Sequence, residues 1–261
     1  MKAIVLSASS DIGIELIKSL NEKGYEVFGT YKNTFPDVKH IKSDNLLKLD
    51  IKDFDSRNYI DWLNKIGEWD LFISCIGTQK PIGFFNEINS REWVEGVSEN
   101  SLYQIGALIN ALKFRNKKIT SSVIFFAGGG TNSATPAYSA QTLGKISLIK
   151  SIEMLNDEID DSKFIILGPG WVKTKIHNST LLAKDKAGKN YKKTILMLES
   201  DKLNSIQKVI KDIFLLISLP KYLVSGRNFS SVHDDLNLSK LKDLYDENKD
   251  FYKLRRNLNN Y

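Results

Sequence analysis

The segment from Ser7 to Gly13, with the sequence SASSDIG, has the residue types needed to hold a phosphate group. It follows the apolar run KAIVL and leads directly into IELIKSL, whose apolar residues recur at helical spacing. A turn of small residues lets backbone N–H groups and the positive end of a helix dipole approach a pyrophosphate. The segment therefore predicts a dinucleotide phosphate site, although a plain strand-to-helix connection would have the same outline.

This turn resembles the glycine-rich turn TGASSGIG of the short-chain dehydrogenase/reductase family. Only the last of the three family glycines is kept, as Gly13. Ser7 replaces a glycine where the chain must turn tightly, and Asp11 would either bring a negative charge near the phosphates or cap the following helix. The resemblance implies that a nicotinamide dinucleotide contacts Ser7, Ser9, Ser10, Asp11, Ile12 and Gly13.

Other stretches resemble the same family in the expected order over about residues 1–230. Asp50 and Ile51 match the residues that meet the adenine, and Gly77 keeps the glycine of the turn after the fourth strand. The sequence GTYKN after the second strand lacks the acid that would hold a ribose 2′-hydroxyl, and Lys32 could pair with a 2′-phosphate, which favours NADP over NAD. The late stretch GPGWVKTKIH resembles the family motif that closes over the nicotinamide. The resemblance would place Pro169, Gly170 and Thr174 near the nicotinamide.

Hydride transfer to a carbonyl needs a proton donor within about 3 Å of the oxygen, with a pKa near neutrality. The family uses a tyrosine for this, together with a lysine one helical turn later, a serine and an asparagine. Asn100 in SENSLYQIG matches the asparagine. The text YSAQTLGK admits one register that pairs Tyr138 with Thr142 and a second that pairs Gln141 with Lys145. The apolar phase of the run after Lys145 favours the second register.

In the second register Gln141 takes the place of the tyrosine and Gly128, thirteen residues earlier, that of the serine. A glutamine amide donates a hydrogen bond but releases no proton at a useful pH, so the ordinary mechanism fails there. A helix beginning near 137 would put Tyr138, as a second candidate acid, on the same face as Gln141 and Lys145. Tyr138 would stand about 10 Å from Lys145 along the helix, so a packing or substrate-contact role is the alternative. Lys145 is expected to bind the cofactor ribose unless it is a surface lysine on a core helix.

A second charged feature follows the sixth expected strand. Seven lysines lie from Lys173 to Lys193 against the single acid Asp185. In the family this stretch is the mobile loop and short helix that cover the substrate. Its positive charge would attract a phosphate, carboxylate or nucleotide-sugar group, whereas an ordinary solvated loop would also carry such charge.

The elements that would position these residues alternate along the chain, which predicts an α/β fold with a Rossmann-type doubly wound parallel sheet and helices on both faces. Ligands of such sheets bind beyond the carboxyl ends of the strands. Strands are expected at 2–7, 25–30, 46–49, 69–75, 120–127, 162–168 and 222–229. Helices are expected at 11–23, 55–66, 90–115 with a break, 137–157, 202–216 and 237–256.

No linker rich in Gly, Pro or Ser divides the chain, so residues 1–235 are predicted to form a single NAD(P)-binding domain. The charged segment 236–261 is predicted to be a helical tail of that domain, with apolar residues available for docking or oligomer contact. The family resemblance implies a homodimer or homotetramer.

Composition excludes several classes of protein. The chain has 261 residues, 42% of them hydrophobic, but no apolar run of about 18 residues and no signal-like start, so a soluble cytoplasmic protein without a membrane partner is expected. The single Cys75 lies in an apolar run and is predicted to be a buried, inert thiol. His40, His177 and His233 are isolated, so no metal site is expected. The net charge of +6 is spread among acids, which argues against nucleic acid as a partner.

These observations favour an NAD(P)-dependent oxidoreductase with altered acid-base residues, acting on a small hydroxyl or carbonyl compound that is anionic or sugar-derived. The alternative is a catalytically silent Rossmann protein that binds a nucleotide or a partner subunit. A non-redox use of the same pocket, as in an isomerase or a lyase, is a third hypothesis.

Overall fold

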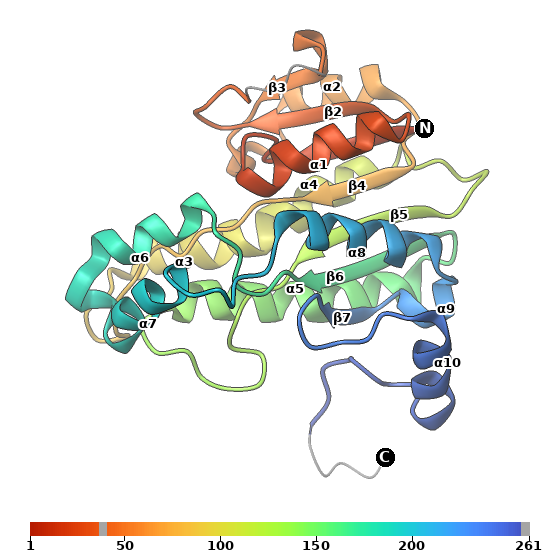
Figure 1. Ribbon diagram of the computed structural model, residues 1–261. Coiled ribbons are helices and arrows are strands. Elements are labelled where there is room, and N and C mark those ends of the chain that lie inside the picture. The colour runs from red at the N-terminus through yellow and green to blue at the C-terminus, as the bar shows by residue number, and fades with distance from the viewer. Residues whose placement is uncertain (37–40, 257–261) are drawn as a thin grey trace.

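The computed structural model describes residues 1–36 and 41–256, and its centre is a seven-stranded parallel sheet (Figure 1). The strand order β3-β2-β1-β4-β5-β6-β7 reverses direction between β1 and β4, which is where ligands of doubly wound sheets bind. The predicted fold class is therefore confirmed. The strands are β1 (Lys2–Leu6), β2 (Glu26–Tyr31), β3 (Leu46–Lys48), β4 (Leu71–Ser74), β5 (Ser121–Phe126), β6 (Ser162–Gly168) and β7 (Arg227–Ser230).

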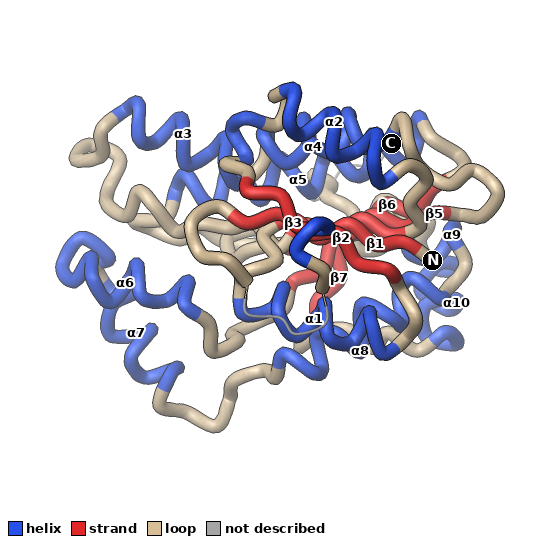
Figure 2. Tube along the Cα trace, turned by 90° about the horizontal axis from the view of Figure 1, so that it is seen from above, coloured by secondary structure: helices blue, strands red, loops and turns tan. Residues whose placement is uncertain are grey.

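Helices cover both faces of the sheet (Figure 2). One face carries α1 (Asp11–Glu22) and α8 (Ile206–Ser218), and the other carries α2 (Arg57–Ile66), α4 (Leu102–Leu112) and α5 (Ser139–Glu158). Each layer has its own apolar core against the sheet, and α5 buries Leu148 and Ile152 in the second one. No helix in the described ranges is long and apolar enough to cross a membrane.

The expected break in the long helix at 90–115 is confirmed. Ser101, with φ −148° and ψ −77°, separates α3 (Ser90–Asn100) from α4. Gly144 lets α3 approach α5 closely, since a Cβ on this glycine would lie 2.6 Å from the Cβ of Asn100. This contact sets Asn100 beside the residue that follows Gly144 on α5.

The seventh strand differs from its prediction, which began at 222. Residues Lys221–Val224 form the short helix α9, and the strand begins only at Arg227, after Gly226 with φ 73°. Leu223 and Val224 are buried, and a short buried apolar run fits a helical turn as well as a strand.

The C-terminal helix α10 (Leu238–Glu247) ends nine residues before the predicted end at 256. Beyond it, Phe251 is buried in the same cluster as Leu236 and Leu241, so this segment packs against the sheet domain without being helical. The expectations for residues 257–261 and for His40 lie outside the described residues.

The connection between β6 and α8 folds into short helices that the sequence pattern does not predict. These are η3 (Lys175–His177), α6 (Asn178–Ala183), η4 (Lys184–Ala187) and α7 (Lys189–Leu198), and they lie beyond the carboxyl ends of the strands (Figure 1). Two more short turns, η1 (Ser43–Asn45) and η2 (Ile51–Asp53), flank β3.

Candidate functional site

The turn after β1 has the backbone conformation that a glycine would favour. Ser7 has φ 59°, in the left-handed region, and its N–H donates to the Oγ1 of Thr30 over 3.2 Å. A Cβ on Gly13 would lie 2.6 Å from the carbonyl oxygen of Ser7, so only glycine lets α1 pack so closely on the turn. Gly13 and the left-handed conformation of Ser7 therefore preserve the tight turn, although two of the family glycines are replaced.

Ser10, not Asp11, caps α1. The Oγ of Ser10 accepts a hydrogen bond from the N–H of Gly13 at 3.0 Å, which corrects the capping role considered for Asp11. Among the described residues, the backbone N–H groups of Asp11 and Ile12 meet no acceptor. These two donors at the positive end of α1 are available to an anionic ligand.

Lys145 projects from α5 to the carboxyl end of β4. Its Nζ donates to the carbonyl oxygen of Ile76 over 3.1 Å, and only 4% of the residue is exposed. A Cβ on Gly77 would lie 3.8 Å from this Nζ and 4.0 Å from the Oδ1 of Asn100. The structure thus brings together Gly77, Asn100 and Lys145, which are 23 and 45 positions apart in the chain.

The side-chain amide of Asn100 is fully used in holding the backbone. It accepts from the N–H of Thr78 at 3.2 Å and donates to the carbonyl oxygens of Thr78 at 3.0 Å and Gly96 at 2.8 Å. Asn100 therefore ties the turn after β4 to α3 and positions the floor of the site.

Gln141 and Gly128 lie at the same cluster. A Cβ on Gly128 would be 3.1 Å from the Cγ of Lys145 and 3.9 Å from the Nε2 of Gln141. Gln141 precedes Lys145 by one helical turn on α5 and has no hydrogen-bond partner among the described residues. The structure thus places Gln141 and Gly128 beside Lys145, and the catalytic places that the second register gives them stay a prediction.

Burial lowers the pKa of Lys145 to about 8, because its hydrogen-bond partner is a neutral carbonyl and no carboxylate compensates for the lost solvent. Burial also raises the pKa of Cys75 to about 12, so this free, partly buried cysteine is protonated near neutral pH. In the described part of the chain no group of three or more His, Cys, Asp or Glu side chains could hold a metal ion.

Tyr138 lies apart from Lys145. The helix α5 begins at Ser139, so Tyr138 occupies its N-cap with φ −126° and does not share a helical face with Gln141, which corrects the expected alignment. Its hydroxyl lies 2.5 Å from the Oγ1 of Thr180, which itself donates to the Oε1 of Gln79 over 2.8 Å. Burial raises the pKa of Tyr138, against a smaller opposite effect of the Thr180 bond. These contacts fit a packing role.

At the second and third strands, the two residues expected at the adenosine end contact each other. The Nζ of Lys32 lies 3.0 Å from the Oδ2 of Asp50, and Ile51 beside them is buried. Burial opposes the charged form of Asp50, but hydrogen bonds from Lys32 and from the N–H of Lys52 outweigh it and lower its pKa. A 2′-phosphate on Lys32 would therefore compete with this carboxylate.

Residues 171–177, here called the closing segment, follow Pro169 and Gly170 and include Thr174. Asn204 fixes the start of the segment by donating to the carbonyl oxygen of Pro169 at 2.8 Å. Trp171 and His177 stack with ring centroids 5.1 Å apart, and the Nε2 of His177 lies 2.9 Å from the carbonyl oxygen of Val172. The segment is therefore a compact unit.

The closing segment reaches the Ser7–Gly13 turn through Lys175, a contact that sequence reasoning missed. The N–H of Lys175 donates to the Oδ2 of Asp11 over 2.6 Å, and its Nζ lies 3.4 Å from the Oδ1 and 3.3 Å from the carbonyl oxygen of Ser9. The next residue, Ile176, would meet a Cβ on Gly77 at 3.8 Å. Because 164 positions separate Asp11 from Lys175, no local pattern could reveal the contact.

The lysines of the lysine-rich stretch do not line the neighbouring cavity, although Ser179, Leu182 and Ala183 of the same stretch do. All seven of its lysines are exposed, whereas the cavity of about 480 Å³ between α3 and α6 is lined by Glu92, Glu95 and Glu99 together with Lys80 and apolar residues. The expectation that these lysines focus positive charge on the substrate finds no support in this lining.

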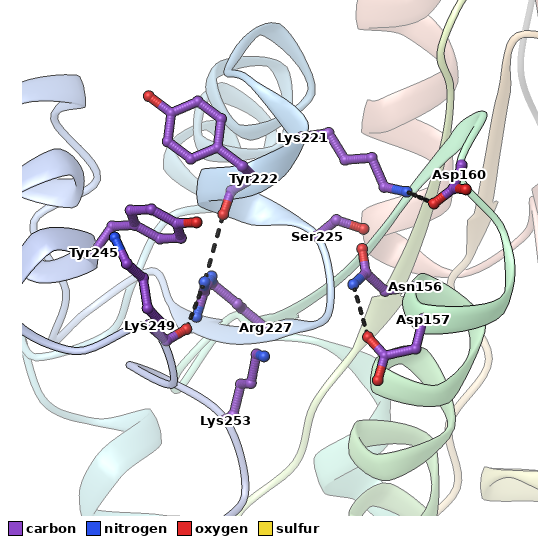
Figure 3. Close-up of a pocket in the computed structure, with 10 residues that line it drawn as sticks. All are labelled: Asn156, Asp157, Asp160, Lys221, Tyr222, Ser225, Arg227, Tyr245, Lys249 and Lys253. Carbon is purple, nitrogen blue, oxygen red and sulfur yellow. Dashed lines mark hydrogen bonds and ion pairs between the residues drawn. The ribbon is translucent and has the colours of Figure 1, made fainter.

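A second cavity, of about 700 Å³, lies at the amino end of the edge strand β7 (Figure 3). Its lining includes the buried Arg227, whose guanidinium donates to the carbonyl oxygens of Lys249 and Phe251 and lies 3.9 Å from the ring centre of Phe251. Arg227 thereby fastens the C-terminal segment to β7. This cavity is remote from the switch point between β1 and β4.

No family model matches the sequence, and no curated protein matches it. Solved structures share its fold. A short-chain dehydrogenase/reductase from Saccharomyces cerevisiae is 19% identical with a TM-score of 0.77, covering 93% of this chain and 98% of its own. The aldohexose dehydrogenase of Thermoplasma acidophilum is 15% identical with a TM-score of 0.75, covering 92% and 94%. A small-chain dehydrogenase in complex with NADPH is 17% identical with a TM-score of 0.69, covering 88% and 95%. The chain has the fold of these dehydrogenases.

Proposed function

We propose that this chain is a divergent member of the short-chain dehydrogenase/reductase family and an NAD(P)-dependent oxidoreductase that acts on a small hydroxyl or carbonyl compound. The observation that carries the proposal is the meeting of Gly77, Asn100 and Lys145 beyond the carboxyl end of β4. These are the residues that the family resemblance selects, and they meet at the switch point of a fold shared with dehydrogenases.

The described residues fit a nicotinamide dinucleotide at two places. The unused N–H groups of Asp11 and Ile12 at the start of α1 suit a diphosphate. Lys145 donates one N–H of its ammonium group to the carbonyl oxygen of Ile76. Its other N–H groups can donate to a ribose hydroxyl beside Gly77, which has no side chain. When bound, the nicotinamide would supply or accept the hydride.

The proton chemistry would fall to Lys145. Its Nζ is the titratable group of the cluster whose pKa, about 8, allows it both to hold and to release a proton near neutral pH. The free amide of Gln141 would orient the substrate oxygen by donating a hydrogen bond, but it keeps its own protons. Gly128 adds no hydroxyl group and leaves room beside Gln141.

A neutral, sugar-derived substrate suits the site better than an anionic one. The cavity beside the site carries three glutamates and one lysine, which would repel a phosphate or carboxylate group. Glutamate side chains accept hydrogen bonds from hydroxyl groups, and one protein with this fold is an aldohexose dehydrogenase.

The test is a titration of the purified protein with NADPH and with NADH, followed by a screen of aldoses, ketoses and their alcohols for absorbance change at the nicotinamide band. We expect saturable binding and slow turnover with at least one neutral sugar. If neither nucleotide binds at millimolar concentration, the assignment as an oxidoreductase is wrong.

A catalytically silent nucleotide-binding protein is the second candidate, because an amide and a glycine stand where the family has two hydroxyl groups. Such a protein would bind NADPH without consuming it. Single-turnover absorbance measurements at high protein concentration separate the two candidates, since an enzyme that relies on Lys145 oxidises bound NADPH when substrate is added.

A further inference from the structure

We propose that Asp11 determines the nucleotide affinity of this site: its carboxylate holds the closing segment across the Ser7–Gly13 turn, and a diphosphate must displace that contact in order to bind. This inference rests on the proposed function, because it concerns the dinucleotide site. It assigns a role to a residue that stands where the family turn has a glycine.

The first step of the argument is the geometry of the contact. Both oxygens of the Asp11 carboxylate face Lys175, one at 2.6 Å from its N–H and the other at 3.4 Å from its Nζ. The Nζ also donates to the carbonyl oxygen of Ser9 at 3.3 Å. Lys175 is therefore bound to the turn by its backbone and its side chain together, and a charge-assisted bond of this length is among the stronger ones in proteins.

The second step is the position of the carboxylate. Asp11 is the first residue of α1, where the helix dipole stabilises negative charge. A bound diphosphate would use the same end of the helix, through the free N–H groups of Asp11 and Ile12. Two anions then share one positive helix end, so the fixed carboxylate weakens binding by repulsion.

The third step is the part of the site that the Asp11–Lys175 contact covers. Ile176 follows Lys175 directly and lies over Gly77, within van der Waals distance of a Cβ placed there, where the nicotinamide half of the site is expected. The stack of Trp171 on His177 joins the two ends of the closing segment. Release of Lys175 from Asp11 would therefore free both the phosphate end and the Gly77 end, and would leave the Lys175 ammonium available to a phosphate.

The experiment compares Asp11→Gly and Asp11→Asn with the unchanged protein. NADPH affinity is measured by calorimetry, and exchange of the Lys175 amide is followed by hydrogen-deuterium exchange without nucleotide. Asp11→Gly removes the acceptor and the charge, whereas Asp11→Asn removes the charge and keeps an acceptor. The matched control is Glu15→Gln, which removes one negative charge from the same helix one turn later.

We expect Asp11→Gly to bind NADPH about tenfold or more tightly and to exchange the Lys175 amide at least tenfold faster, with Asp11→Asn intermediate and Glu15→Gln unchanged. Equal affinity in all four proteins would overturn this inference and leave the proposed function standing. Absence of binding in all four would overturn the proposed function itself. Should Asp11→Gly fail to fold, Asp11→Asn decides the question by both measurements.

Discussion

Tyr138 and Thr180 are joined through their hydroxyl groups over 2.5 Å, 42 positions apart in the chain. Because Thr180 donates its own hydrogen to Gln79, the hydrogen between the two hydroxyl groups comes from Tyr138. The phenol thus fastens α6 to the start of α5, and burial raises its pKa.

Replacing Tyr138 with phenylalanine should therefore affect stability and leave the nucleotide site intact. We expect the free energy of unfolding to fall by about 0.5–1.5 kcal/mol, the usual value of one buried hydrogen bond, with NADPH affinity unchanged. Urea denaturation and calorimetry measure the two quantities. Tyr103→Phe is the control, because its hydroxyl bonds Glu95 at the surface. Loss of turnover in Tyr138→Phe but not in Tyr103→Phe would show that Tyr138 is the acid after all.

Lys145→Met should stabilise the protein and abolish nucleotide binding. The folded chain holds the Lys145 proton with a pKa of about 8, against 10.5 for the ordinary side chain, so at pH 7 the folded state bears the full cost of a buried charge. Met removes that cost, and we expect a gain of about 1–3 kcal/mol in the free energy of unfolding at pH 7.

The pH dependence of stability tests whether a buried charge on Lys145 destabilises the folded protein. Between pH 8 and 10.5 the unfolded chain binds more protons at this lysine than the folded chain, so the unchanged protein gains stability as the pH rises and its difference from Lys145→Met narrows. Urea denaturation at pH 7, 8.5 and 10 measures this. The exposed Lys18→Met on α1 serves as the control and should change stability by less than about 0.5 kcal/mol. A gap that widens with pH would contradict the buried-charge account.

Lys32→Ala should change the preference between the two nucleotides. The Lys32 side chain is about half exposed and its Nζ lies 3.0 Å from the Oδ2 of Asp50, so the lysine can pair with a 2′-phosphate only by sharing its charge with that carboxylate. We expect NADPH affinity to fall about three- to tenfold, which is modest for a charged contact because of this competition, and NADH affinity to stay constant. The ratio of the two dissociation constants is the measurement. Asp50→Asn should shift the ratio the other way, and a ratio unaffected by both changes would exclude Lys32 from the site.

The fold could be predicted from the sequence because its signals are local. Apolar runs such as KAIVL and the small-residue turn before α1 fix a strand and the helix start within a few residues, and repeated along the chain they define the parallel sheet. The lysine and asparagine of the site were selected by their resemblance to the family motifs and by no local pattern of their own. The start of β7 was misplaced because Leu223 and Val224 suit a buried helical turn and a strand equally well.

The contacts that close the site could not be predicted, because they join residues far apart in the sequence. The role of Asp11 depends on Lys175, and that of Tyr138 on Thr180, and neither pair shares an element. The charge of the cavity between α3 and α6 likewise depends on which side of α3 meets α6, which places Glu95 and Glu99 in its lining and leaves the lysines of the lysine-rich stretch outside it.

Apolar side chains on α4 and α5 predict a self-association surface. Leu102 and Ile109 lie two turns apart on α4 and are 57% and 53% exposed, and Met154 on α5 is 56% exposed. Such exposure on neighbouring helices favours a symmetric contact between copies. We expect a dimer or tetramer that Ile109→Glu converts to monomer, as measured by light scattering during size-exclusion chromatography. Leu196→Glu, at a still more exposed position on α7, is the control, and a monomeric unchanged protein would contradict the prediction.

Gln141→Tyr tests the catalytic register directly. The change places a phenol one helical turn before Lys145, whose ammonium form would lower the pKa of that phenol and make it a proton donor. With any carbonyl substrate found in the screen, we expect turnover to rise about 10- to 100-fold, less than a full general acid provides because Gly128 still lacks a hydroxyl group. Gln141→Phe, which adds the ring without the hydroxyl, should not raise turnover. The rate of Gln141→Tyr should also fall at high pH as the phenol ionises. If Gln141→Tyr binds NADPH as tightly as the unchanged protein yet shows no gain over Gln141→Phe, then position 141 does not face the reacting oxygen, and the register that pairs it with Lys145 is wrong.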